Sequence, residues 1–443
     1  MLFENGEKAM VAFLMALIVA GLGSLPLLAG RKFGAAAITS AVYFVALWPI
    51  FYAACPSLVW PLGGLLSVFL LLCWAVSAII GSIIEGKRRW TWLFTVALLV
   101  IMVFRAGSGC GCFRASEYSK LIGDFEEKEW TQDVQPASAE HIRLVPWELA
   151  CFLADKQLGQ VAGGAIGSQF SIDRGRAAIQ RIKGEFWWVV PLDYNGFTVW
   201  TSVDYAPGYV LVHADDPNVP PIVKSTEKFR FTPGAYFADN LERHLWSNGY
   251  LAKGLGDAFL EIDETGKAWW VVVVFKPTIA YSGSKMTGVA IVDPENGDIT
   301  FYESDKIPEW VDRAVPDHFV RSYINLWGSL RGGWVNSWWG KKDLIEAEPS
   351  EFIFGTDGEP YFVTRITSTA TGDEAVVGMF YTNSRTGKTV KYHTIGATDA
   401  SILKVVEGLV GFKNWYGVSP TIYNIYGVMT SVVPILSQSH VFQ

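Results

Sequence analysis

The chain has 443 residues, half of them hydrophobic, and a formal net charge of −7 at pH 7. Its length allows about three domains, and its positive mean hydropathy is high for a soluble protein. The acidic balance argues against nucleic-acid binding, so no nucleic-acid partner is expected.

Residues 1–109 are predicted to form a membrane region. One charge-free run extends from Ala9 to Gly30, and a second, from Phe33 to Ile84, is long enough for two crossings. The fourth predicted span is short, but arginines at its ends can extend to the membrane surface. We predict four transmembrane helices, at residues 10–29, 33–54, 62–84 and 90–107.

Basic residues between these helices set the predicted orientation. Arg31 and Lys32 follow the first helix and residues 87–89 follow the third, whereas the loop after the second is uncharged. The positive-inside rule places both basic loops in the cytoplasm. The N-terminus and the large region after Gly107 are then extracytoplasmic, in a four-pass integral membrane protein. We expect the first helix to be retained, because the segment before it is net acidic, unlike that of a signal peptide.

Charge differs between the two regions. Residues 1–109 contain seven Lys or Arg and three Asp or Glu, which gives +4, so with a total of −7 the remaining residues carry −11. An acidic outer region argues against its lying on an anionic lipid surface. Residues 110–140 are interpreted as an acidic linker. The run Asp124–Glu129 within it is interpreted as a solvated helix face or linker, with a partner-docking patch as the alternative.

Two sequence motifs then occur three times, in step. The first is a Gly, two residues, two aromatic residues and a Val, beginning at Gly184, Gly266 and Gly358. The second has Asp or Asn four residues before a Gly, at Asp204–Gly208, Asp293–Gly297 and Asn383–Gly387. Such a repeat indicates three copies of one structural unit. In each turn the Asp or Asn can accept a hydrogen bond from the backbone two residues on, and the Gly supplies a positive φ.

A helix is predicted before each copy, and strands are predicted within it. The apolar spacing indicates helices at 147–158, 236–246 and 319–327, with a further helix at 399–412. The second copy has strand signals at 269–275, 289–292 and 299–302. The predicted fold class is therefore α+β: an N-terminal four-helix transmembrane region followed by three helix-plus-antiparallel-sheet repeats. The predicted boundaries are 141–225, 226–307 and 308–397 for the three units, and 398–443 for a terminal helix and uncharged strands.

This arrangement resembles the PepSY domain family, and the second unit fits best. The third unit departs from the pattern because it carries Asn383 in place of Asp. The resemblance implies extracytoplasmic, non-catalytic modules that bind or restrain other proteins, sometimes peptidases, and it assigns no catalytic residue. The combination with a four-helix membrane region is also similar to a class of membrane proteins to which no activity is attached.

The cysteines and histidines point to no reaction. Cys55, Cys110 and Cys112 would lie on the oxidising side and are the disulfide candidates. A Cys110–Cys112 bridge would be strained, so pairing with Cys55 is preferred. The six histidines are scattered, and no hydrolase, metalloprotease or phosphate-binding motif is present. We therefore expect no catalytic residue, no metal site and no cofactor.

Aromatic residues are the main binding candidates. Five tryptophans between Trp310 and Trp339 lie within thirty residues, and three interpretations stay open: core packing, a docking surface, or an interfacial membrane belt. The tail from Asn414 has no charged residue and predicts strands at 421–426 and 428–433. These strands would either close the third sheet or augment that of a neighbouring subunit. The candidate docking residues are Trp334, Trp338, Trp339, Tyr423 and Tyr426.

The preferred function is a non-enzymatic, membrane-anchored extracytoplasmic binding or scaffold protein within a cell-envelope or membrane-associated assembly. Two alternatives are a regulator or inhibitor of an extracytoplasmic peptidase and a channel or transporter subunit. The channel is disfavoured because no charged residue lies in the interior of the predicted helices. The expected partners are membrane lipids and either another protein or other copies of the chain.

Overall fold

The computed structural model describes residues 2–59, 64–85, 96, 99–101, 103–104, 107–137, 142–160, 165–369 and 375–437. The chain divides into two compact units. The first unit comprises Met1–Phe113, Tyr236–Leu255 and Lys276–Gly283. The second comprises Arg114–Ala235, Gly256–Phe275 and Ser284–Gln443.

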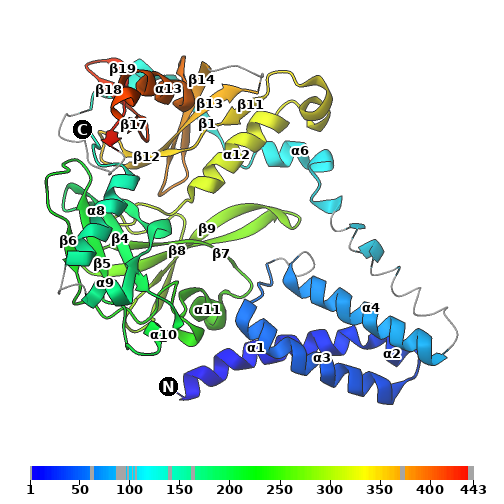
Figure 1. Ribbon diagram of the computed structural model, residues 1–443. Helices are drawn as coiled ribbons and strands as arrows, with labels where there is room; N and C mark the ends of the chain where they lie inside the picture. Colours follow the sequence, from blue (N-terminus) through cyan, green and yellow to red (C-terminus); the bar gives the residue numbers. More distant parts are fainter. Residues whose placement is uncertain are drawn as a thin grey trace. The chain divides into compact units, whose positions relative to one another are not determined.

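The first unit is built on apolar helices that lie side by side (Figure 1). Three helical stretches are long and apolar enough to cross a membrane: Met10–Ala29, Phe33–Ala54 and Leu65–Ile84. They match the first three predicted spans. Most of the fourth predicted span, 90–107, lies outside the described residues. The helices of this unit are α1 (Leu2–Gly23), α2 (Leu25–Ala29), α3 (Phe33–Ala54) and α4 (Leu65–Glu85).

The segment Tyr236–Leu255 belongs to this first unit. Trp246 is buried in the same apolar cluster as Met15 and Phe51, and its indole donates to the carbonyl of Pro56 at 3.1 Å. Arg243 donates to the carbonyl of Ala53 at 3.1 Å, in the last turn of α3. A cation is favourable there because the last carbonyls of a helix lack intrahelical donors.

The first sheet of the second unit is covered by α8 (Trp147–Gln160), which confirms the first helix predicted before a repeat. Leu149, Ala154 and Leu158 of this helix are buried with Trp188 and Val210 of the sheet. The order of the sheet is β2-β4-β5-β6, and β3 also pairs with β4. Its strands are β2 (Phe170–Ile172), β3 (Ala178–Ile182), β4 (Glu185–Tyr194), β5 (Tyr209–His213) and β6 (Ile222–Lys224).

The second sheet is an antiparallel meander whose three predicted strands are confirmed. The helix expected at 236–246 is shorter and broken: α11 spans only Leu241–Leu245, between a 3₁₀ turn and a π turn. Asn240 is the N-cap residue of α11, and its side chain accepts a hydrogen bond from the backbone amide of Arg243. The order is β10-β9-β8-β7, with β7 (Gly254–Ile262), β8 (Ala268–Ile279), β9 (Ser282–Val292) and β10 (Ile299–Glu303).

The third sheet packs against α12 (Asp317–Leu330), the helix predicted at 319–327. Its strand order is β1-β15-β14-β13-β11. In addition, β12 pairs with β13, and β16 pairs with β14. The strands are β11 (Ile345–Ala347), β12 (Glu351–Phe354), β13 (Pro360–Ser368), β14 (Ala375–Asn383), β15 (Thr389–His393) and β16 (Gly396–Ala397).

The predicted acidic linker contains an edge strand of this third sheet. The run interpreted as a solvated helix face or linker is β1 (Phe125–Glu129), which pairs in parallel with β15. Phe125 packs against the rings of Trp327 and Phe380, at 5.5 and 5.3 Å. The glutamates of β1 face solvent or the cations of β15, and Phe125 is the residue that anchors the strand in the apolar core.

The glycines of the repeated turns have the positive φ that the sequence predicts, but the predicted side-chain hydrogen bond is present at Asp293 and Asn383 and not at Asp204. Gly184, Gly266 and Gly358 open their turns with φ of +91°, +92° and +78°. The closing glycines Gly208, Gly297 and Gly387 also have positive φ. The Asp293 and Asn383 side chains each accept a hydrogen bond from the amide two residues on, at 2.9 and 3.1 Å.

The structure explains why the third repeat has Asn where the second has Asp. In the second repeat, Lys267 follows the opening glycine and forms an ion pair with Asp293 at 2.7 Å. In the third, Glu359 takes the place of Lys267 and accepts from the Asn383 amide at 3.1 Å. An aspartate at 383 would bring two carboxylates together. In these two copies the closing residue suits the charge of its partner, whereas in the first copy, with Glu185 and Asp204, the structure shows no contact of this kind between the two.

The C-terminal region forms its own small sheets. The predicted helix is α13 (Asp399–Val410), and the predicted strands are confirmed as β18 (Thr421–Ile425) and β19 (Val428–Val432). These two strands pair only with each other among the described residues, and β17 (Trp415–Gly417) pairs with β20 (Ile435–Ser437). The tail therefore does not close the third sheet, contrary to one of the two expectations.

The turn pair provides a direct test. We expect Asn383→Asp to destabilise the protein by about 1–3 kcal/mol, because Glu359 loses a buried donor and gains a carboxylate neighbour. Adding Glu359→Gln should recover part of this loss. Thermal unfolding of the full chain in detergent, followed by circular dichroism, measures both. Additive effects of the two substitutions would contradict a direct contact.

Candidate functional site

Three of the candidate docking residues lie together on an exposed loop after α12, residues 331–342, called here the tryptophan loop. Trp338 and Trp339 are 62% and 76% exposed, and Trp334 is also exposed. The rings of Trp334 and Trp338 stack at 5.9 Å, and Trp339 packs edge-on against Trp338 at 5.6 Å. These exposures rule out core packing for the three residues.

Hydrogen bonds within the loop fix its conformation. The Asn336 side chain donates to the carbonyl of Lys342 at 2.9 Å and accepts from its amide at 3.1 Å. Gly333 has a φ of +86°, which allows the chain to turn after α12. The indoles are therefore presented by a preformed loop.

The two tyrosine candidates differ from each other. Tyr426 is 95% exposed at the tip of the β18–β19 hairpin. Tyr423 is only 7% exposed, and its hydroxyl accepts from the Arg143 amide at 3.1 Å. The prediction that Tyr423 docks a partner is therefore wrong, because four consecutive residues of β18, Thr421 to Asn424, are buried and Tyr423 is among them.

An apolar stripe on α13 was missed at the sequence level. Val405, Leu409 and Phe412 are 64%, 67% and 79% exposed and follow i, i+4, i+7 spacing, with Phe412 in the 3₁₀ turn after the helix. The opposite face packs inward, where Leu403 and Val406 lie against Gly417. The apolar residues of α13 are spread around most of its circumference, so the periodicity of the sequence could not show which face would be exposed.

The expected cysteine pairing is not formed. All five cysteines are free. Cys55 ends α3 and its sulfur accepts from the Arg243 guanidinium at 3.3 Å, while the sulfurs of Cys110 and Cys112 lie 2.7 Å from each other. Arg243, brought in from a distant segment, thus occupies the place expected for the second thiol.

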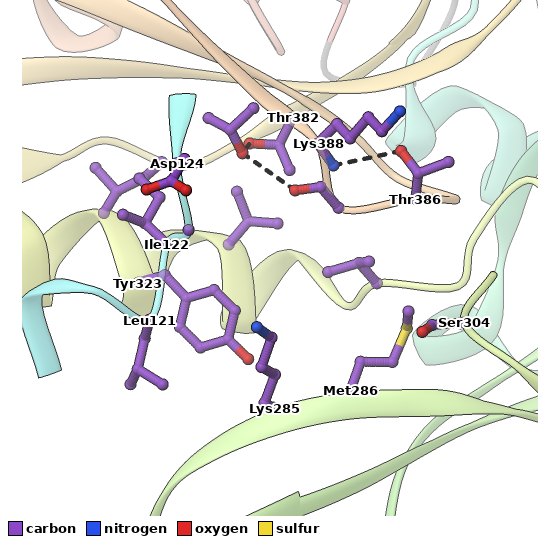
Figure 2. Close-up of a pocket in the computed structure, with 16 residues that line it drawn as sticks. Leu121, Ile122, Asp124, Lys285, Met286, Ser304, Tyr323, Thr382, Thr386 and Lys388 are labelled. Carbon is purple, nitrogen blue, oxygen red and sulfur yellow. Dashed lines mark hydrogen bonds between the residues drawn. The ribbon is translucent and has the colours of Figure 1, made fainter. Parts of the chain in front are cut away.

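A cavity of about 250 Å³ lies between the second and third repeats (Figure 2). Lys285 extends from β9 toward Tyr323 of α12, and Asp124 lies on the opposite wall. Hydroxyl groups from the β14–β15 turn and apolar side chains complete the lining. Its walls suit a small, partly apolar group. The lining residues are Leu121–Asp124, Lys285, Met286, Ser304, Val315, Val320, Tyr323, Ile324, Thr382 and Thr386–Thr389.

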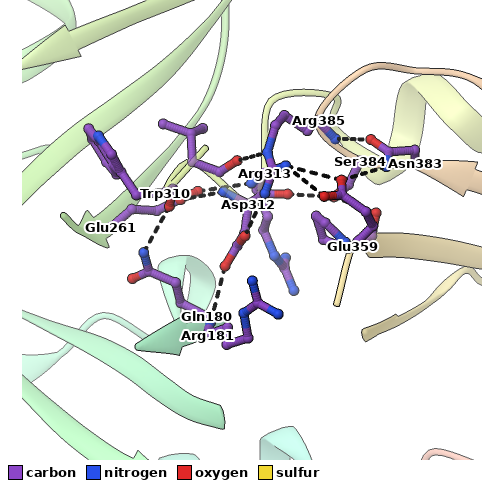
Figure 3. Close-up of polar contacts among 12 residues, drawn as sticks. Gln180, Arg181, Glu261, Trp310, Asp312, Arg313, Glu359, Asn383, Ser384 and Arg385 are labelled. Atoms are coloured by element: carbon purple, nitrogen blue, oxygen red, sulfur yellow. Dashed lines mark hydrogen bonds and ion pairs between the residues drawn. The ribbon is translucent and has the colours of Figure 1, made fainter. Parts of the chain in front are cut away.

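A buried polar network surrounds the segment that links the second and third repeats (Figure 3). From the first repeat, the Gln180 amide donates to the carbonyls of Ile262 and Trp310, at 2.8 and 3.1 Å. From the second, the Glu261 carboxyl accepts from the amides of Asp312 and Arg313, at 2.7 and 3.0 Å. The linking segment is therefore held by groups from both preceding sheets.

The third repeat completes this network. The Arg385 guanidinium donates to the carbonyl of Val311 at 2.9 Å and forms ion pairs with Glu359 and Asp312, at 3.0 and 3.4 Å. Ser384 accepts from the Val315 amide at 2.7 Å through its carbonyl, and its hydroxyl donates to the carbonyl of Asp312. Groups from all three sheets and their turns thus meet at one short segment.

Burial shifts the pKa values of the ionisable groups in this network. Loss of solvent, with the neighbouring Asp312 charge, raises the pKa of Glu261 to about 8. Burial raises the pKa of Asp312 to about 6. Burial also lowers the pKa of Arg313 to about 10, and its guanidinium lies 4.3 Å from the centre of the Phe352 ring. Glu261 binds the backbone of the segment 310–315, and Asp312 lines a cavity of about 220 Å³.

One exposed group of side chains has the composition of a cation site. Asp257, Asp317 and His318 offer oxygen and nitrogen atoms close together. The His318 ring forms an ion pair with Asp257 at 3.3 Å, which raises the pKa of His318 and lowers that of Asp257. This pair explains the cluster without a metal.

Comparison of the chain with protein-family models, curated proteins and solved structures gave no match in any of the three.

The raised pKa of Glu261 predicts a pH dependence of stability. The folded state keeps a proton that the unfolded state releases between about pH 4.5 and 8, so stability falls as pH rises through this window. The slope is up to about 1.4 kcal/mol per pH unit. Glu261→Gln stays neutral throughout. We expect this variant to gain stability relative to the natural protein as pH increases from 5 to 8.

Thermal unfolding of both proteins in detergent at several pH values measures this gain. Glu303→Gln, on exposed β10, is the matched control and should follow the natural protein at each pH. Parallel curves for Glu261→Gln and the natural protein would contradict a buried protonated carboxyl group.

Proposed function

We propose that the protein is a non-enzymatic, membrane-anchored scaffold that assembles with other copies of itself. Three apolar helices provide the anchor. The observation that carries the proposal is the bare apolar stripe Val405, Leu409 and Phe412 on α13. Soluble surfaces rarely expose a contiguous stripe of this kind unless a partner covers it.

The stripe has the geometry of a helix-packing face. Side chains at i, i+4 and i+7 form a single ridge, and such ridges pack into the groove of another helix. Full burial of one such side chain contributes roughly 1.5–3 kcal/mol. Gly408 borders the ridge, and a Cβ there would meet no neighbouring atom, so a second helix could approach closely. A two-fold pair of α13 helices would cover the stripe on both chains.

The polar network supports a scaffold rather than a reaction. Its carboxylates and arginines bind backbone groups of the segment 310–315 and are used in joining the repeats. A rigid arrangement of three modules suits a protein that holds a partner surface in place. The resemblance to PepSY modules agrees with this proposal.

The proposed topology places the repeats outside the cytoplasm. Arg31 and Lys32 follow the first described span and residues 87–89 follow the third, so both basic loops lie on one side. The repeats then require a fourth crossing at 90–107.

The native mass of the full chain in mild detergent tests the assembly. Light scattering should give a protein mass of at least twice 49.0 kDa. We expect the double variant Val405→Ser, Leu409→Ser to fall to one chain, because it removes the centre of the apolar ridge.

The matched control is Lys404→Ser, Glu407→Ser, which changes exposed residues of the same helix outside the stripe and should keep the larger mass. A natural protein that is monomeric would overturn self-assembly. A single chain in fixed stoichiometry with a different protein would also overturn it, in favour of a foreign partner.

A further inference from the structure

The tryptophan loop has no role in the assembly proposed above. It exposes Trp334, Val335, Trp338 and Trp339 as one apolar surface. The three indoles contact one another, and hydrogen bonds of Asn336 fix the conformation of the loop. An exposed surface of this size and rigidity indicates a binding partner.

The residue types indicate which partner. Indole rings concentrate at the interface between lipid headgroups and hydrocarbon, because they combine a large apolar ring with a polar N–H group. Val335, which lies between Trp334 and Trp338 in the sequence and is also exposed, adds a purely aliphatic side chain. Surface-bound membrane segments combine such an apolar face with flanking Lys and Arg.

Charge supplies the second, independent argument. The chain after residue 109 carries −11, so its surface as a whole is repelled by anionic lipid. The tryptophan loop has the opposite sign: Arg331, Lys341 and Lys342 flank the indoles and are all exposed, against the single carboxylate of Asp343. Arg331 is held by stacking on Trp327 at 4.4 Å and by a hydrogen bond to the carbonyl of Asp343 at 2.6 Å. Cations flanking an apolar surface complement the phosphates of anionic lipids.

We propose that the tryptophan loop is a membrane contact that rests in the interfacial layer of a bilayer containing anionic lipid. The chain carries three helices able to span a bilayer, so a bilayer is a partner available to the loop. The indoles enter the interface and the three flanking cations contact lipid phosphates. The α13 stripe contains no tryptophan, and the exposed charged residues beside it, Lys404, Glu407 and Lys413, are of both signs, which separates the two surfaces by chemistry.

Quenching of tryptophan fluorescence by brominated lipids tests the contact. The full chain is reconstituted into phosphatidylcholine vesicles with and without phosphatidylglycerol, with bromine near the headgroup end of the acyl chain. The triple variant Trp334→Ser, Trp338→Ser, Trp339→Ser removes three of the 19 tryptophans. We expect its total fluorescence to fall by up to three parts in 19, and the whole of this loss to come from the fluorescence that brominated lipid quenches. Lys341→Gln, Lys342→Gln should reduce quenching only in vesicles that contain phosphatidylglycerol.

Trp147→Ser is the matched control, because Trp147 is exposed on α8 and should leave the quenched component unchanged. Thermal unfolding midpoints equal to that of the natural protein show that the variants are folded. Unchanged quenching in the triple variant would overturn the proposal. Loss of native mass in that variant without loss of quenching would overturn it too, in favour of a protein contact at the loop.

Discussion

The segment from Trp310 to Val315 is the point on which the second unit depends. Groups from three sheets and their turns reach its backbone: Gln180 from the first sheet, Glu261 from the second, and Ser384 and Arg385 from the turn after β14 of the third. Buried carboxylates and guanidinium groups are costly unless each is paired or hydrogen bonded. Here their partners are largely backbone amides and carbonyls of one segment, so the charges and the arrangement of the repeats require each other. Removing one partner would leave a buried group without compensation.

The interior of the second unit and its surface differ in the side chains that they carry. Buried polar groups of the second unit join its three sheets. Two apolar surfaces remain outside, the α13 stripe and the tryptophan loop, and they differ in character. The stripe is aliphatic apart from Phe412 and follows the helical repeat, as suits another helix. The loop combines indoles with cations, as suits a lipid interface. A scaffold held against its own membrane and packed against its neighbours would use both.

The repeats show how the sequence was sufficient for local geometry. The sequence shows which glycines need a positive φ, and the structure has it at each of them. The sequence also shows which Asp or Asn can accept from the backbone amide two residues on, and Asp293 and Asn383 do so. The replacement of Asp by Asn in the third repeat looks like divergence in the sequence. In the structure the Asn383 side chain donates to Glu359, which stands where the second copy of the motif has Lys267. The pair could not be recognised without knowing that the opening and closing turns touch.

The sequence by itself determined the three apolar helices, β8, β9, β10, β18 and β19, and α8, α12 and α13, because these depend on residues close together in the chain. Tertiary structure alone decided the rest. The acidic run 124–129 became a strand because β15, more than 250 residues away, offered an edge and Trp327 and Phe380 received Phe125. Glu261 holds its proton because distant segments exclude water from it. Tyr423 is buried, whereas Trp338 and Trp339 are exposed, because burial depends on what packs against a residue and not on its type.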